Sequence, residues 1–118
     1  MTSTEKMQKI VEFLDSKKAH DIKVLKVQDL TLLADYFVIC SAQSTTQVKA
    51  LSDNLQEHLE EIGEEPLKRE GKQGLNWILL DYSDVIVHIF YQETREFYGL
   101  EKLWADAEEI DITEIVKE

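Results

Sequence analysis

A single cysteine and three histidines are the residues best suited to nucleophilic or metal chemistry. Cys40 stands far from His20 and His58 in the sequence, and His88 is equally isolated. A structural zinc site needs four donors, usually from closely spaced Cys and His residues. A nucleophilic pair needs a thiol and an imidazole in hydrogen-bond contact, with a third group to orient the base. The spacing therefore predicts no metal site, an inert buried thiol and an interior His88, while a Cys40–His88 pair stays an open alternative.

Two aspartates in the second half of the chain could belong to a phosphoryl-transfer site. That chemistry needs carboxylates a few ångströms apart to hold magnesium ions, and a backbone cradle for phosphates. Asp81 and Asp84 flank an expected turn, where aspartate commonly bonds to the backbone. No Asp-x-Asp or Asp-x-Glu pair lies on an expected strand, and residues 42–46 contain no glycine. We therefore expect no enzyme and no cofactor, with a nucleotidyltransferase-like enzyme and a small metabolite-binding regulatory domain as the alternatives.

Charge narrows the classes of partner. The 118 residues include 24 Asp and Glu against 13 Lys and Arg, a formal net charge of −11. Nucleic-acid binding draws much of its affinity from cations that neutralise phosphates, so little direct contact with nucleic acid is expected. An anionic membrane is an equally poor partner. A basic protein suits the charge better, because opposite fields steer encounter, although the same charge also favours solubility.

The length predicts one domain, which we assign to residues 1–107, followed by an acidic tail over 108–118. Apolar runs reach only four or five residues, so no membrane-spanning helix is expected. No basic segment followed by an apolar stretch opens the sequence as a signal peptide would. A single cysteine can form no internal disulfide, which suits a cytoplasmic protein.

Alternating helical and strand periods predict an α+β, sandwich-like fold with a mixed four-stranded sheet and helices mainly on one face. Capping boxes at Thr2–Glu5 and Ser44–Gln47 predict the starts of the first two helices. The region 64–74, which contains Pro66, Gly71 and Gly74, is expected to be a loop. The expected order of elements is α-β-β-α-β-β-α. The first half has a helix to about residue 18, strands over 22–27 and 36–40, and a helix ending at Gly63. The second half has a tight hairpin of strands 77–82 and 85–91, and a helix over 94–107 that Gly99 kinks or splits.

Three blocks of sequence are distinctive as a set. They are Ala34-Asp35-Tyr36-Phe37-Val38-Ile39-Cys40-Ser41, then Glu70-Gly71 with Trp77-Ile78-Leu79-Leu80-Asp81-Tyr82-Ser83-Asp84-Val85, then His88-Ile89-Phe90 with Arg95-Glu96-Phe97-Tyr98-Gly99-Leu100-Glu101-Lys102-Leu103-Trp104. In this order and at these separations they resemble the RsfS/Iojap family of ribosomal silencing factors over residues 6–107. Ser83 and Ala42-Gln43 depart from the family pattern, which usually has glycine at Ser83 and Gly-Thr or Gly-Ser at the second place.

The resemblance implies a reduced nucleotidyltransferase fold that has lost its chemistry. It also implies binding to the large ribosomal subunit through its fourteenth protein, which is small and basic. Bound there, such a protein hinders joining of the small subunit and lowers translation when nutrients are short. Homodimers are implied as well.

Strand alternation sorts the hairpin residues into two faces. One face is purely aliphatic and is expected to pack under helices: Ile78, Leu80, Val85, Val87 and Ile89. The other mixes large apolar groups with polar tips, which suits an interface core, and antiparallel sheets commonly leave one face uncovered. We expect this face, with residues just after the hairpin, to bind the ribosomal protein with Trp77 as the anchor; the alternative is that the last helix covers Trp77 and Phe90. The candidate partner-binding residues are Trp77, Leu79, Asp81, His88, Phe90, Tyr98, Leu100 and Lys102. Arg95 and Glu96 are expected to form a local pair.

Overall fold

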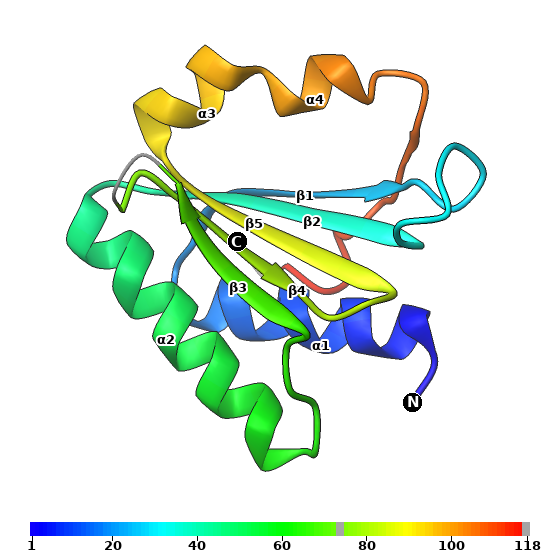
Figure 1. The fold of residues 1–118 in the computed structure, drawn as a ribbon, viewed down its shortest axis with the longest axis horizontal. Coiled ribbons are helices and arrows are strands. Elements are labelled where there is room, and N and C mark those ends of the chain that lie inside the picture. The colour runs from blue at the N-terminus through cyan, green and yellow to red at the C-terminus, as the bar shows by residue number, and fades with distance from the viewer. Residues whose placement is uncertain (73–74, 117–118) are drawn as a thin grey trace.

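A six-stranded mixed sheet with helices on both faces forms the fold (Figure 1). The computed structural model describes residues 1–72 and 75–116. The strand order is β3-β4-β5-β2-β1-β6, in which β2 and β5 run parallel and the other neighbours antiparallel. The α+β class is confirmed, whereas the predicted count of four strands is wrong. The elements are α1 (Ser3–Ser16), β1 (His20–Lys26), β2 (Tyr36–Ala42), α2 (Thr45–Glu61), β3 (Lys68–Lys72), β4 (Trp77–Asp81), β5 (Val85–Tyr91), α3 (Gln92–Tyr98), α4 (Leu100–Leu103) and β6 (Glu108–Glu109).

Both predicted capping boxes begin a helix. The Thr2 hydroxyl accepts from the backbone N–H of Glu5, whose carboxylate accepts in return from the Thr2 N–H, each at 3.1 Å. The Ser44 hydroxyl accepts from Gln47 N–H at 3.1 Å, but the Gln47 side chain accepts from Gln43 instead of Ser44. These bonds satisfy backbone donors that the first turn of a helix leaves open.

Two strands were absent from the prediction. β3 pairs antiparallel with β4, although the region 64–74 was expected to be a loop. β6 pairs antiparallel with β1 inside the segment expected to be an acidic tail, and the Ile110 N–H continues that edge by donating to Val24 O at 2.9 Å. Ile112 and Val116 then pack on the core. The described part of this segment therefore lies along the sheet.

The sheet divides the core into two layers (Figure 1). The long helices α1 and α2 cover one face, and the aliphatic hairpin residues predicted to lie under helices, such as Leu80 and Val87, are buried there. The short helices α3 and α4 lie over the other face, where Leu100 closes a second core around Phe37 and Phe90. Most of the helical residues therefore lie on one face, as expected, while two short helices cover part of the other. Among the described residues, no helix combines the length and apolarity needed to cross a membrane.

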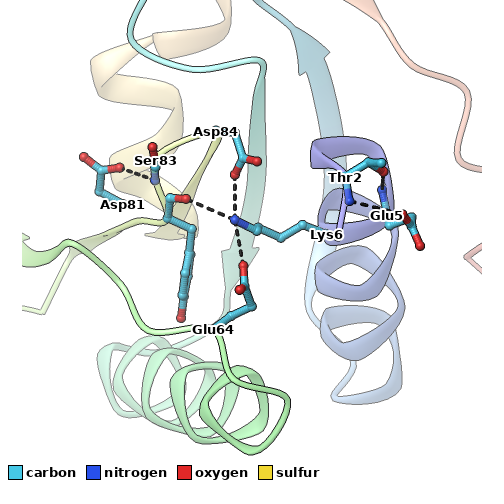
Figure 2. A network of polar contacts seen from close by, with 8 residues as sticks. Thr2, Glu5, Lys6, Glu64, Asp81, Ser83 and Asp84 are labelled. Atoms are coloured by element: carbon cyan, nitrogen blue, oxygen red, sulfur yellow. Dashed lines mark hydrogen bonds and ion pairs between the residues drawn. The ribbon is translucent and has the colours of Figure 1, made fainter.

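A buried lysine joins α1 to the hairpin and to the segment after α2 (Figure 2). The Lys6 ammonium donates to Asp84 Oδ1 at 2.7 Å and to Tyr82 O at 3.3 Å, and lies 2.8 Å from Glu64 Oε1. Burial lowers the pKa of Lys6, but its hydrogen bonds to Asp84 and Glu64 outweigh that effect and leave the pKa raised. The ammonium therefore stays charged and links three segments that are distant in the sequence.

Candidate partner-binding face

An aromatic cluster lies on the sheet face beneath α3. Trp77 at the start of β4 pairs across the sheet with Phe90 on β5, and the two rings stack with centroids 4.7 Å apart. Tyr98 at the end of α3 lies 5.2 Å from the Trp77 ring. The Trp77 indole Nε1 donates a hydrogen bond of 3.2 Å to His88 Nδ1. Trp77 and Tyr98 are half-buried, so the cluster reaches the surface at these two rings.

The centre of this face is covered, contrary to the expectation of an open sheet. Phe90 has no exposed surface, and His88 and Leu100 keep only 4% and 9% of theirs. Helices α3 and α4 account for the cover, because Leu100 from α4 packs into this core and the neighbouring Trp104 meets Phe37 edge-on at 5.0 Å. The exposed part of the face lies along β4, where Trp77, Leu79 and Asp81 are each half-buried.

The structure separates the two residues of the candidate nucleophilic pair. Cys40 lies in the core under α1 and α2, whereas His88 lies in the core on the opposite side of the sheet, against Phe37 and Phe90. Burial raises the pKa of the Cys40 thiol to about 12, so the thiolate is not formed near neutral pH. The pair is therefore excluded. Among the described residues, no cluster of three or more His, Cys, Asp or Glu is placed to hold a metal ion.

Burial also lowers the pKa of His88 to about 3, so the ring is neutral at physiological pH. Its Nδ1 accepts from the indole of Trp77, which places the single proton of the neutral ring on Nε2. That Nε2 atom is buried with no hydrogen-bond partner among the described residues. His88 is therefore an interior histidine, as predicted, but only one of its two nitrogens is satisfied.

Asp81 and Asp84 have separate structural roles at the hairpin turn (Figure 2). The Asp81 carboxylate accepts from the Ser83 N–H at 2.8 Å, which is the local turn bonding expected of aspartate. The Asp84 N–H donates to Tyr82 O at 3.0 Å across Ser83, whose φ is +76°, in the pattern of a γ-turn. Because the Asp84 carboxylate binds Lys6, the two aspartates do not form a joint site.

Arg95 pairs with Glu101, not with Glu96 as predicted. Its Nε donates to Glu101 Oε1 at 2.7 Å, and its Nη1 donates to Asp21 O at 2.7 Å and to Ser41 Oγ at 2.8 Å. The hydrogen bonds from Arg95 and Lys23 hold the pKa of Glu101 below its usual value against the opposing effect of burial. This buried guanidinium ties α3 and α4 to β1 and β2, and so fixes the layer that carries Tyr98.

Two apolar residues of the last helical segment face solvent. Phe97 on α3 and Leu103 on α4 are 83% and 77% exposed, although they share helical spacing with Leu100 and Trp104. Gly99, at φ +58°, breaks that spacing by ending α3 in the left-handed conformation. The apolar residues that share this spacing therefore fall into two groups. Leu100 and Trp104 face inward, whereas Phe97 and Leu103 face solvent. Lys102 is also exposed, beside Leu103.

These features define an α+β domain whose aromatic cluster reaches the surface along β4. Over residues 1–118 the chain matches the family model described as "Ribosomal silencing factor during starvation". A "Ribosomal silencing factor RsfS" from Halalkalibacterium halodurans is 36% identical over 116 residues, which are 98% of this chain and 99% of that protein. The chain belongs to the RsfS family of ribosomal silencing factors, which are non-enzymatic, ribosome-binding regulators of translation.

A solved structure and an organellar relative extend the likeness. The crystal structure of a Chromobacterium violaceum protein is similar with a TM-score of 0.85 and 33% identity, covering 89% of this chain and 88% of that one. The mouse protein "Mitochondrial assembly of ribosomal large subunit protein 1" is 37% identical over 98 residues, which are 80% of this chain but 43% of that protein. The expected family is therefore confirmed, and with it the expectation that the protein is a regulator and not an enzyme.

Proposed function

We propose that this protein docks on the large ribosomal subunit through the subunit's basic fourteenth protein and blocks joining of the small subunit by occupying space. Membership of the ribosomal silencing factor family supports the ribosome as target, and the name of the mouse relative refers to the large subunit. The mechanism makes and breaks no covalent bond. Its effect depends only on how long and where the protein stays bound.

The observation that carries the proposal is the half-buried Trp77 on its aromatic support. Its ring rests on Phe90 and lies beside Tyr98, so the plane of the indole is set before a partner arrives. Preorganised aromatic anchors with a buried base and an exposed edge are the residues that most often dominate binding energy. Leu79 and Asp81 continue the contact surface along β4. Phe90, His88 and Leu100 support this surface from beneath. The exposed Lys102 lines a groove with Asp21 and Ser41, on the β1–β2 side of α4, and is proposed as a contact of its own there.

Charge supports a basic protein over RNA as the direct contact. The net charge of −11 attracts a basic surface and is repelled by nearby phosphates. We assign docking to residues 1–107 and place the protein in the cytoplasm, where it meets ribosomes.

We also propose that the protein forms homodimers. Static light scattering at micromolar concentration tests this proposal, and a monomer mass at every concentration contradicts it.

Sedimentation with purified large subunits through a sucrose cushion tests docking. The wild-type protein is expected to pellet with the subunits, and Trp77→Ala is expected to weaken binding by about thirtyfold, the effect of losing an anchor worth about 2 kcal/mol. Leu32→Ala is the matched control, because Leu32 is fully exposed in the loop between β1 and β2 and belongs to neither core. Failure of the wild-type protein to pellet, or equal binding by Trp77→Ala, contradicts the proposal.

A subunit-joining assay separates binding from blocking. Wild-type protein added to large subunits before small subunits is expected to reduce the amount of joined ribosomes in a sucrose gradient, and Trp77→Ala is expected to restore it. Normal joining in the presence of saturating, bound wild-type protein would contradict the steric mechanism while leaving docking intact.

A further inference from the structure

His88 is the one buried polar side chain of the aromatic cluster, and its setting is unfavourable for a polar group. The ring is 4% exposed and packs against Phe37 at 5.1 Å, Trp77 at 5.9 Å and Phe90 at 6.3 Å between centroids. Its Nε2 has no hydrogen-bond partner among the described residues. A buried donor without an acceptor destabilises a fold, whereas a phenylalanine of similar shape would leave no such group. Packing alone therefore does not explain a histidine at this position.

The other nitrogen has a specific contact. His88 Nδ1 accepts the indole N–H of Trp77 at 3.2 Å, and Trp77 is the half-exposed ring at the edge of the face. Stacking on Phe90 fixes the plane of the indole, but an aromatic stack permits the ring to turn or slide within that plane. A hydrogen bond to a fixed acceptor removes this freedom. The acceptor is itself immobile, because His88 lies on the central part of β5 between β4 and β2.

We propose that His88 is a positioning residue for docking: its Nδ1 holds the Trp77 indole in the single orientation that the partner contacts. This inference rests on the proposed docking through Trp77. His88 does not touch the partner, because almost none of its surface is exposed. It acts by removing alternative orientations of the anchor, so that binding does not have to order the ring.

Two substitutions at this position separate positioning from stability. His88→Phe keeps a planar aromatic ring, somewhat larger than imidazole, and removes both nitrogens, so the acceptor is lost while the unpartnered Nε2 disappears. His88→Asn keeps an oxygen acceptor bonded to Cγ, where the histidine has Nδ1, but leaves the rest of the ring space empty. We expect His88→Phe to unfold at the same urea concentration as wild type or higher, and His88→Asn to unfold at a lower one.

Docking is expected to follow the opposite order. His88→Phe should raise the Kd for purified large subunits about tenfold, the scale of one hydrogen bond, whereas His88→Asn should stay within about threefold of wild type. A purely structural role predicts that binding follows stability, with His88→Asn the weaker binder. That result would overturn the proposal.

The orientation of the indole is measured without ribosomes. In ¹⁵N-labelled protein the Trp77 indole cross-peak, identified by its absence in Trp77→Phe, is expected to move and to exchange faster with water in His88→Phe, and to remain close to wild type in His88→Asn. An unchanged cross-peak in His88→Phe contradicts the proposal. If Trp77→Ala binds subunits normally, the docking proposal fails and this inference fails with it; if Trp77→Ala loses binding and His88→Phe does not, only this inference fails.

Discussion

Lys6 illustrates how a buried polar residue can organise a fold whose core is mostly apolar. It lies on α1 among core residues, and its ammonium reaches two carboxylates and a carbonyl around the hairpin turn. An ion pair away from water stabilises a structure only when its remaining donors are satisfied, which is the case here. At the same scale, the sequence predicted which hairpin residues share the face of the aromatic cluster, but not that Phe90 and His88 are covered, and not the Lys6 or Arg95 contacts. Their partners are distant in the sequence, and no local pattern encodes such pairs.

Removal of the Lys6 charge should destabilise the protein. In Lys6→Met, Asp84 and Glu64 lose their shared cation and repel each other, and because both are about one-third exposed the expected loss of unfolding free energy is about 2 kcal/mol. Urea denaturation at neutral pH measures it. Lys9→Met, on the solvent-facing side of the same helix, is the control and should differ little from wild type. Equal stability of the two variants would show that the network contributes nothing.

Protonation of His88 should make the protein sensitive to acid. Burial lowers its pKa to about 3 in the folded state, from about 6.5 in the unfolded chain, so between these values the unfolded chain binds a proton that the folded state does not. Above about pH 6.5 His88 is neutral in both states, so its titration costs the folded state nothing. As the pH falls below that value, the free energy of unfolding decreases by about 1.4 kcal/mol per pH unit.

Urea denaturation of wild type and His88→Phe at about pH 7 and about pH 5 tests this. Because carboxylates with lowered pKa values, such as Glu101, act in the same direction in both proteins, only the difference between the two slopes reports His88. Wild type is expected to lose about 2 kcal/mol more than the variant over this interval. Parallel slopes would contradict a buried, neutral His88.

At the scale of elements, hydrophobic periodicity predicted the helices and strands that have an apolar face and missed the strands that lack one. Helices α1 and α2, the buried strand β2 and the β4–β5 hairpin all carry regular apolar patterns, and the structure has them near the predicted residues. β3 reads Lys-Arg-Glu-Gly-Lys, a charged edge strand that joins the sheet through its backbone and carries no apolar alternation. Helices α3 and α4 cover the cluster to a degree set by the turn at Gly99. The spacing of apolar residues does not determine the direction of that turn.

The hairpin turn holds local strain that a glycine should release. Ser83 has φ +76°, a conformation in which a side chain is disfavoured, and the turn keeps it there through the bonds around Asp81 and Asp84. We expect Ser83→Gly to raise the free energy of unfolding by about 0.5–1 kcal/mol, because glycine adopts this φ readily. Thermal denaturation measures the change, with Ser83→Ala as the control that keeps the Cβ. A glycine variant less stable than Ser83→Ala would contradict strain at this turn.

At the scale of the whole molecule, the fold presents one aromatic edge on a strongly acidic body. Helices α1 and α2 cover the face of the sheet opposite the cluster (Figure 1). The half-buried rings of Trp77 and Tyr98 lie on the other side, where we propose that the partner docks. In the proposed complex, short-range contacts at that edge would determine the dissociation rate, while the net charge of −11 would influence the association rate. The two contributions can be measured separately.

Salt should slow association with the large subunit and have a smaller effect on dissociation. Raising the ionic strength from about 50 mM to about 500 mM shortens the screening length from over 10 Å to about 4 Å, so the attraction between an acidic protein and a basic target acts over a shorter range. Stopped-flow binding should show an association rate several-fold lower at high salt. An association rate that rises with salt would indicate that ribosomal phosphates, and not a basic protein, dominate the encounter.

The parallel pairing of β2 with β5 has a consequence for how this protein is made. Residue 36 meets residue 85 at the centre of the sheet, so β2, whose residues are all buried in the finished fold, has no neighbour on that side until most of the chain has been synthesised. A nascent chain at that stage exposes an aromatic and β-branched strand to the cell. The centre of the sheet can therefore close only late in synthesis, after β5 has left the ribosome.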